Sequence, residues 1–73
     1  MKSYIIVTFN SEGAKPSEVA NKLAMLGFKP AKGNYDFFYE WSKQPTLEDA
    51  IVLADKVHEM LRGTKVIFKM ETI

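Results

Sequence analysis

The sequence contains no cysteine among its 73 residues, so it can form neither disulfides nor thiolate metal sites, and it cannot use a thiol in catalysis. An excess of one charge is missing too, because ten Lys and Arg residues are balanced by nine Asp and Glu, for a net charge of +1. A chain this close to neutral has no field that would attract nucleic acid or anionic lipid. Composition therefore gives no support to a nucleic-acid partner or a membrane partner.

The chain also lacks any apolar run near the roughly 18–20 residues of a membrane span, and its first residues lack the long apolar segment of a signal peptide. Hydrophobic residues make up 47% of the sequence, too many for a disordered tail. A domain of this size buries only about 60% of the surface that its unfolded chain exposes. We expect a single cytoplasmic domain over residues 1–73, with a core that is well packed or shared with a partner.

Four segments have the composition of β-strands, and turn residues separate them. Residues 4–9 and 35–41 are rich in β-branched and aromatic side chains, and residues 64–72 alternate apolar with polar side chains. Residues 28–31 predict only a short strand, because Pro30 has no N–H to donate to a ladder and therefore suits a sheet edge.

Two further segments predict helices. The first begins near Pro16, which suits a first helical position, and ends at Gly27. The second begins after Thr46, an N-cap residue with Asp49 three positions later, and ends at Gly63. Its apolar stripe is expected to comprise Leu47, Ala50, Ile51, Ala54, Val57, His58 and Leu61.

The resulting order of elements, βαββαβ with short connections, resembles the ferredoxin-like plan. It predicts an α+β fold in two layers, with a four-stranded antiparallel sheet whose strands lie in the order fourth, first, third, second. Right-handed crossovers bring both helices to the same face of this sheet. The opposite face is then left without helices.

This face without helices is expected to be a binding surface. Alternation along the strands directs Ile6, Phe38 and Ile67 to it, and it also directs Asp36 outward as a solvated charge, while Tyr35 shares the helix-facing side. An apolar centre with a charged rim is typical of an interface between proteins. The residues expected to form the interface are Tyr4, Ile6, Phe38, Glu40, Ile67 and Lys69.

Residues that could carry catalysis are scarce. His58 is the only imidazole, and its place at the margin of the second helix's stripe predicts a partly buried structural side chain. One His offers too few ligands for a metal site, and no serine lies at a recognisable nucleophile elbow. We expect no catalytic residues, no metal and no cofactor, and therefore a protein that is not an enzyme.

One segment partly matches the third-strand signature of RNA-recognition motifs. Residues 32–39 (KGNYDFFY) begin and end as that signature does. They depart from it at Asn34 and Asp36, the positions whose aromatic rings stack on bases. Outward-facing acidic residues on this strand also repel a phosphate backbone, so nucleic acid is disfavoured as a partner.

The same segment resembles the ligand-sensing RAM domain of leucine-responsive regulators, in which a Gly-x-aromatic-Asp turn leads into a hydrophobic strand. Residues 33–36 (GNYD) match that turn, and the mainly aromatic residues 37–41 (FFYEW) follow it. The resemblance implies a dimer formed through sheet faces, with a small effector such as an amino acid bound at the subunit contact. It places Gly33, Tyr35 and Asp36 in the ligand region.

The leading hypothesis is a small non-enzymatic binding module that forms a homodimer through its open sheet face and senses a small molecule. Three alternatives stay open. They are a protein-interaction module without a small-molecule ligand, an RNA-binding module, and a cofactor-free enzyme with its pocket between two subunits.

Overall fold

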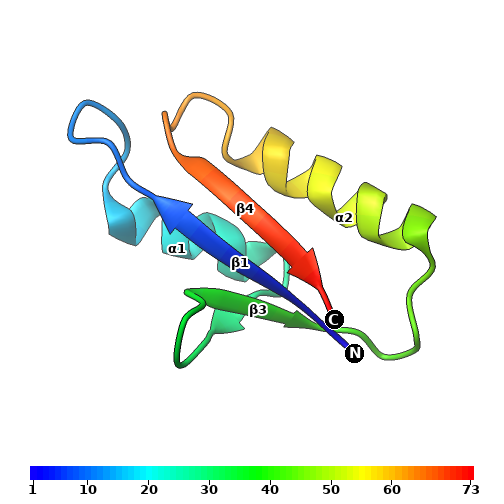
Figure 1. Cartoon of the computed structure of the whole chain (residues 1–73). Coiled ribbons are helices and arrows are strands. Elements are labelled where there is room, and N and C mark those ends of the chain that lie inside the picture. The colour runs from blue at the N-terminus through cyan, green and yellow to red at the C-terminus, as the bar shows by residue number, and fades with distance from the viewer.

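The protein folds around one four-stranded antiparallel sheet, seen in a computed structural model that describes all 73 residues (Figure 1). Its elements are β1 (Lys2–Thr8), α1 (Pro16–Met25), β2 (Lys29–Pro30), β3 (Phe37–Glu40), α2 (Leu47–Met60) and β4 (Ile67–Thr72). The strands lie in the order β2-β3-β1-β4, which is the predicted order read from the opposite edge. The α+β class and the strand order are therefore confirmed. Neither helix has the length and the apolar character needed to span a membrane.

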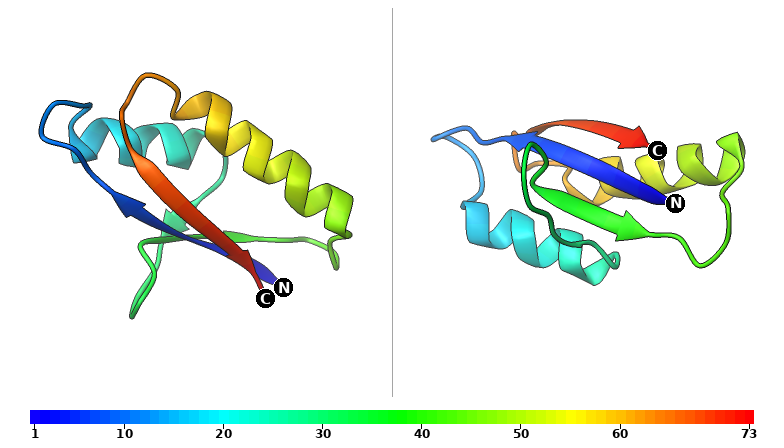
Figure 2. Two further views of the ribbon diagram at one scale, coloured as in Figure 1. Left: turned by 45° about the horizontal axis from the view of Figure 1, so that its top comes forward. Right: turned by 60° about the horizontal axis from the view of Figure 1, so that its bottom comes forward.

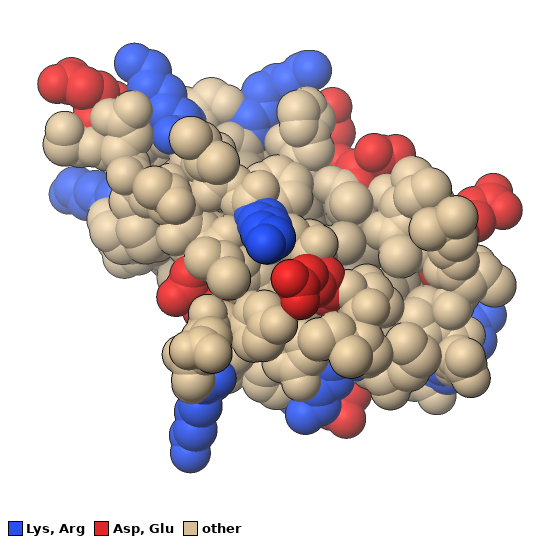
Figure 3. Space-filling model, in the orientation of Figure 1, with Lys and Arg blue, Asp and Glu red and all other residues tan.

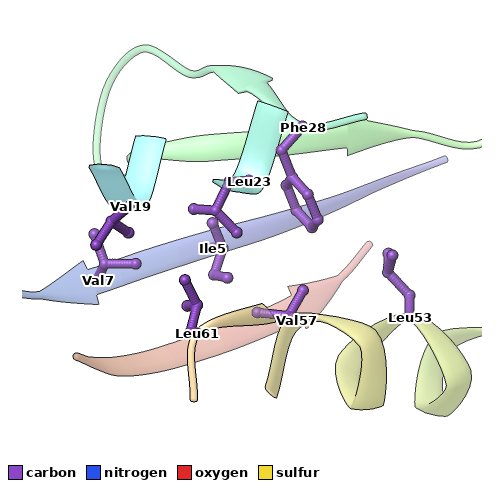
Figure 4. Close-up of a cluster of buried hydrophobic side chains, with 8 residues drawn as sticks. All are labelled: Ile5, Val7, Val19, Leu23, Phe28, Leu53, Val57 and Leu61. Carbon is purple, nitrogen blue, oxygen red and sulfur yellow. The ribbon is translucent and has the colours of Figure 1, made fainter. Parts of the chain in front are cut away.

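Both helices cover the same face of the sheet, and the hydrophobic core lies between the two layers (Figures 2 and 4). Along β1, buried and half-exposed residues alternate, as expected for a strand with only one covered face. Figure 4 shows Ile5 and Val7 of this strand facing side chains from both helices. The buried hydrophobic side chains are Ile5, Val7, Val19, Leu23, Phe28, Leu53, Val57 and Leu61.

Helix α1 has the expected ends. Pro16 occupies its first turn, and after the last turn Gly27 takes a φ of +103°, a value that glycine adopts without steric cost. The chain then turns back, because the Phe28 N–H donates to the Leu23 carbonyl at 3.1 Å. Phe28 is thereby buried against the ring of Tyr39, with the two ring centroids 5.6 Å apart.

Helix α2 begins at the predicted capping box. The Thr46 hydroxyl accepts a hydrogen bond from the Asp49 N–H at 3.1 Å, and the Asp49 carboxylate accepts one from the Thr46 N–H at 3.0 Å. The second of these bonds favours the charged carboxylate and lowers the pKa of Asp49. Two of the first N–H groups, which no helical carbonyl can satisfy, are paired in this way.

The predicted apolar stripe of α2 is partly wrong. Leu47 and Ile51 are 79% and 52% exposed and His58 is also exposed, whereas Leu53, absent from the predicted stripe, is buried with Val57. The helix carries two apolar stripes, and only one of them can face the sheet. The stripe that packs is the one formed by Leu53, Val57 and Leu61. His58 lies outside it and is a solvated residue, not a partly buried structural one.

One small polar cluster lies within the core. Ser3 is fully buried, and its hydroxyl accepts a hydrogen bond from the Trp41 indole N–H at 2.8 Å. The same hydroxyl lies 2.7 Å from the Thr72 hydroxyl, so that one of the two donates to the other. These bonds join β1 to β4 and to the end of β3, and they satisfy every polar atom of the cluster that lies away from water.

The loop before α1 is held tightly against the loop before β4. The Ala14 N–H donates to the Thr64 carbonyl at 3.0 Å, and Thr64 is itself buried. Its hydroxyl donates to the Leu61 carbonyl and accepts from the Val66 N–H. Gly13 lies so close to this loop that a Cβ at its position would overlap with the Thr64 carbonyl oxygen.

We predict that Gly13→Ala lowers the free energy of unfolding by about 2–3 kcal/mol, because two backbone segments must separate to admit the methyl group. Gly27→Ala should cost about 1 kcal/mol, the usual penalty for a Cβ at positive φ, since its only close neighbour is the edge of the Tyr39 ring and no backbone atom is in the way. Urea denaturation of both variants measures the difference. A Gly13→Ala protein as stable as the wild type would show that these loops are not in contact.

Candidate binding surface on the open face of the sheet

The face of the sheet opposite the helices, here called the open face, carries the residues that alternation assigned to it. Cross-strand partners share a face, and β1 pairs Tyr4 with Phe38 of β3 and Ile6 with Lys69 of β4. Ile67 lies opposite Thr8 and is 72% exposed, whereas Ile6 and Phe38 are half-buried. The open face therefore presents an apolar centre on its two middle strands and an apolar side chain at its margin.

Aromatic rings dominate this centre. The rings of Tyr4 and Tyr35 stack with centroids 4.5 Å apart and planes inclined by 28°. The Tyr35 hydroxyl donates to the Glu71 carboxylate at 2.9 Å, and the Lys2 ammonium lies 4.8 Å from the centroid of the Phe38 ring. Stacking, hydrogen bonding and the cation–π contact hold these side chains in place before any partner binds.

Tyr35 and Asp36 lie on sides of the sheet opposite to those predicted. Regular pairing of β3 starts only at Phe37, so alternation cannot be extended back through the preceding turn. At this irregular point Asp36 makes two hydrogen bonds to β1. The Asp36 N–H donates to the Ile5 carbonyl, and the Asp36 carboxylate accepts from the Val7 N–H at 2.9 Å. The expectation that Asp36 is merely a solvated charge is therefore wrong, because its side chain takes the place of a ladder carbonyl.

Asp36 also lines a shallow hollow of about 400 Å³ on the helix side of the sheet. Phe9, Pro16 and Ala20 supply apolar walls, and the Ser17 side chain from the first turn of α1 adds a hydroxyl. Phe9 continues the alternation of Ile5 and Val7, but it lies beyond the end of β1 and is 42% exposed at the rim of this hollow. The hollow therefore combines one carboxylate with mostly apolar surroundings.

The three residues assigned to a ligand region are not brought together. Tyr35 belongs to the open face, Asp36 to the hollow on the other side, and Gly33 to the tip of the turn, where a Cβ would meet no atom within 4 Å. The tyrosine and the carboxylate instead serve two separate surfaces.

Charges on the open face are few and of both signs. The Lys69 ammonium and the Glu71 carboxylate on β4 lie 3.8 Å apart. Lys2 of β1 is paired with Glu40 of β3. Figure 3 shows isolated charged side chains spread over a largely uncharged surface, with no region of a single sign. Such a surface favours a partner with both charges of its own over a polyanion.

A groove between the helices was missed by the sequence analysis. It has a volume of about 480 Å³ and is lined by Leu26, Val52, Asp55, Lys56, Glu59 and Met60. Helical spacing could have placed Val52, Lys56 and Met60 on one flank, but the position of the end of α1 beside them depends on tertiary packing.

The structure shows no group of three or more His, Asp and Glu side chains that could hold a metal ion. The single histidine, His58, is exposed on α2. No family model matches the sequence, and no curated protein and no solved structure is significantly similar to it. The open face is therefore interpreted from its own residues.

The hydrogen bond to Glu71 favours the neutral phenol, so the pKa of Tyr35 is raised above its ordinary value of 10.0. Stability from this bond is complete below about pH 10 and is lost as the pH rises through the pKa of the folded protein. We predict that an ultraviolet titration finds one of the three tyrosines ionising later than in Glu71→Ala. Identical titrations of the two proteins would show that this hydrogen bond does not form.

Proposed function

We propose that the protein is a non-enzymatic binding module on a ferredoxin-like plan, and that its open face is the binding surface. The observation that carries this proposal is the aromatic and apolar centre on β1, β3 and the turn before β3, built from Tyr4, Ile6, Phe38 and Tyr35. Clustered aromatic side chains on a sheet face without a covering layer are typical of interfaces. No comparable cluster of polar side chains suggests a reaction.

The aromatic centre is suited to tight contact because its side chains are already ordered. Tyr35 is fixed by its stack on Tyr4 and by its bond to Glu71, so little side-chain entropy remains to be lost on binding. Large rigid rings also bury much area for the few torsions they contain. A flat apolar partner would therefore gain from contact without a large ordering cost.

The partner that fits best is a second copy of the chain, stacked face to face. The face carries Lys2 and Lys69 together with Glu40 and Glu71, so two copies can oppose unlike charges around apolar centres. A small domain also gains stability by sharing apolar surface. Nucleic acid fits less well, because a carboxylate is bonded directly to the aromatic stack.

We predict that the protein self-associates at micromolar concentration and that Phe38→Glu weakens this association at least about tenfold, because two carboxylates would be buried between the faces. Phe38→Leu keeps the centre apolar and should retain the association. Sedimentation equilibrium measures all three proteins, and thermal melting checks that each is folded. A wild-type monomer at millimolar concentration contradicts the proposal.

A second candidate is the binding of a small amine or amino acid in the hollow beside Asp36. The specific observation is a carboxylate surrounded by Phe9, Pro16 and Ala20, a combination that suits an ammonium group with an apolar side chain. One carboxylate oxygen is used by the Val7 N–H, and the other has no partner in the protein. This candidate retains the predicted class of effector, a small molecule such as an amino acid. Of the three residues predicted to bind it, only Asp36 lines the hollow.

For this candidate we predict that amino acids at millimolar concentration raise the melting temperature of the wild type but not of Asp36→Asn. The amide still offers an oxygen to the Val7 N–H, so the fold should lose little stability. Asp36→Ala leaves that N–H unpaired and should cost about 1–2 kcal/mol. If none of the twenty amino acids shifts the melting temperature of the wild type, effector sensing is excluded.

A further inference from the structure

The outer edge of β4 is an unpaired strand edge. Lys2 and Ile73 exchange both backbone hydrogen bonds, at 3.2 and 3.0 Å, which fixes the alternation of the β1–β4 ladder. Every second residue of β4 therefore bonds to β1, and the residues between them, Phe68, Met70 and Thr72, direct their N–H and C=O groups away from the sheet. These groups form a row to which another strand could hydrogen-bond.

The two edges of the sheet differ in their protection. The opposite edge, β2, has only two residues and contains Pro30, and both properties discourage pairing with another chain. β4 has six residues, contains neither proline nor glycine, and is flanked by Ile73 with 61% exposure. One edge of the sheet is blocked while the other is left able to pair.

We propose that β4 pairs antiparallel with β4 of a second copy, with Met70 opposite Met70 of that copy, so that one sheet runs through both. In this register Lys69 lies directly opposite Glu71 of the second copy, and the reverse pair forms on the other side of the two-fold axis. Ile67 lies opposite Ile73, and both of these side chains are largely exposed in the single chain. In this register each charged residue lies opposite a residue of the other sign, and each exposed isoleucine lies opposite another isoleucine.

Neighbouring two-fold registers are disfavoured by the same charges. A shift in one direction places Lys69 opposite Lys69, and a shift in the other direction places Glu71 opposite Glu71, in each case with like charges as direct neighbours. Only the register centred on Met70 pairs both charges with opposite ones. It also uses the whole strand from Ile67 to Ile73, so the sequence of β4 selects one register.

An exposed flank of α2 supports the same contact. Val52 and Lys56 lie on the flank of α2 that faces the end of α1. Helical spacing places Leu47 and Ile51 on the opposite flank of α2, and they remain 79% and 52% exposed. Figure 1 shows α2 running beside β4. Two-fold pairing of β4 brings this flank toward the same flank of the second copy, where these side chains would be covered.

Edge pairing does not use the apolar centre of the open face. Opposite residues in a paired ladder share a face, so the open faces of the two copies lie on the same side of the joined sheet. Edge pairing therefore does not depend on the proposed function of the open face. It would join the open faces of the two copies into one continuous surface. A face-to-face contact and an edge contact can therefore be tested separately.

Engineered cysteines test the register directly, because the natural chain has none. Met70→Cys should form an intermolecular disulfide under mild oxidation, since a hydrogen-bonded pair places two Cα atoms about 5.5 Å apart. Lys69→Cys and Glu71→Cys should not link to themselves, but an equimolar mixture of the two should. The side chain of Met70 lies on the helix side of the sheet, so stacked open faces cannot link it.

Charge exchange in the Phe38→Glu background gives a second test in solution, because Lys69 and Glu71 also lie on the open face, whose stacking that background disrupts. Lys69→Glu and Glu71→Lys should each weaken edge pairing about tenfold or more, because each places like charges opposite one another twice. An equimolar mixture of the two variants should restore association as a heterodimer, and the double exchange Lys69→Glu/Glu71→Lys should restore the homodimer. Both positions are exposed, so the variants are expected to fold, which thermal melting verifies.

The outcomes separate this contact from the face-to-face one. Edge pairing predicts that Met70→Cys still links in the Phe38→Glu background, where the open face is disrupted. No linking of Cys at position 70, or no restoration when the charge variants are mixed in the Phe38→Glu background, overturns edge pairing. Linking that disappears with Phe38→Glu also overturns it, because the contact would then depend on the open face.

Discussion

The packing of β1 between its two neighbouring strands and under both helices is the constraint on which the rest of the structure depends. Its alternate residues Ile5 and Val7 are covered by both helices, and the strand hydrogen-bonds to β3 on one side and to β4 on the other. Because successive side chains point to opposite faces, burial of these two also fixes the outward positions of Tyr4 and Ile6. The core and the apolar centre of the open face both follow from the alternation of this one strand.

The irregular backbone before β3 places the side chains of Tyr35 and Asp36 on opposite sides of the sheet. The Asp36 carboxylate completes the hydrogen bonding of β1 on the helix side, and this position of Asp36 allows Tyr35 to turn onto the open face and stack on Tyr4. A regular strand would have placed both side chains the other way round. The aromatic centre therefore exists because one carboxylate substitutes for a backbone carbonyl, and the same carboxylate gives the neighbouring hollow its only charge.

The sheet is asymmetric in a way that bears on assembly. Short, proline-containing β2 closes one edge, whereas β4 presents an unpaired row of backbone groups with one lysine and one glutamate two positions apart. On the open face the same two residues lie 3.8 Å apart within the chain and form part of the charged rim. Lys69 and Glu71 thus belong to both candidate contact surfaces, and the apolar centre and the strand edge distinguish the two.

Local sequence determined the elements and most of the sheet. Alternation identified the open-face positions of β1 and β4, the Thr46–Asp49 pair marked the start of α2, and Gly27 marked the end of α1, because each depends only on nearby residues. Tertiary structure decided the rotation of α2, which carries two apolar stripes of which only one can meet the sheet. It also decided the sides taken by Tyr35 and Asp36, because their orientation depends on hydrogen bonds to β1, a strand almost thirty positions away in the chain. Periodicity within a segment cannot contain that information.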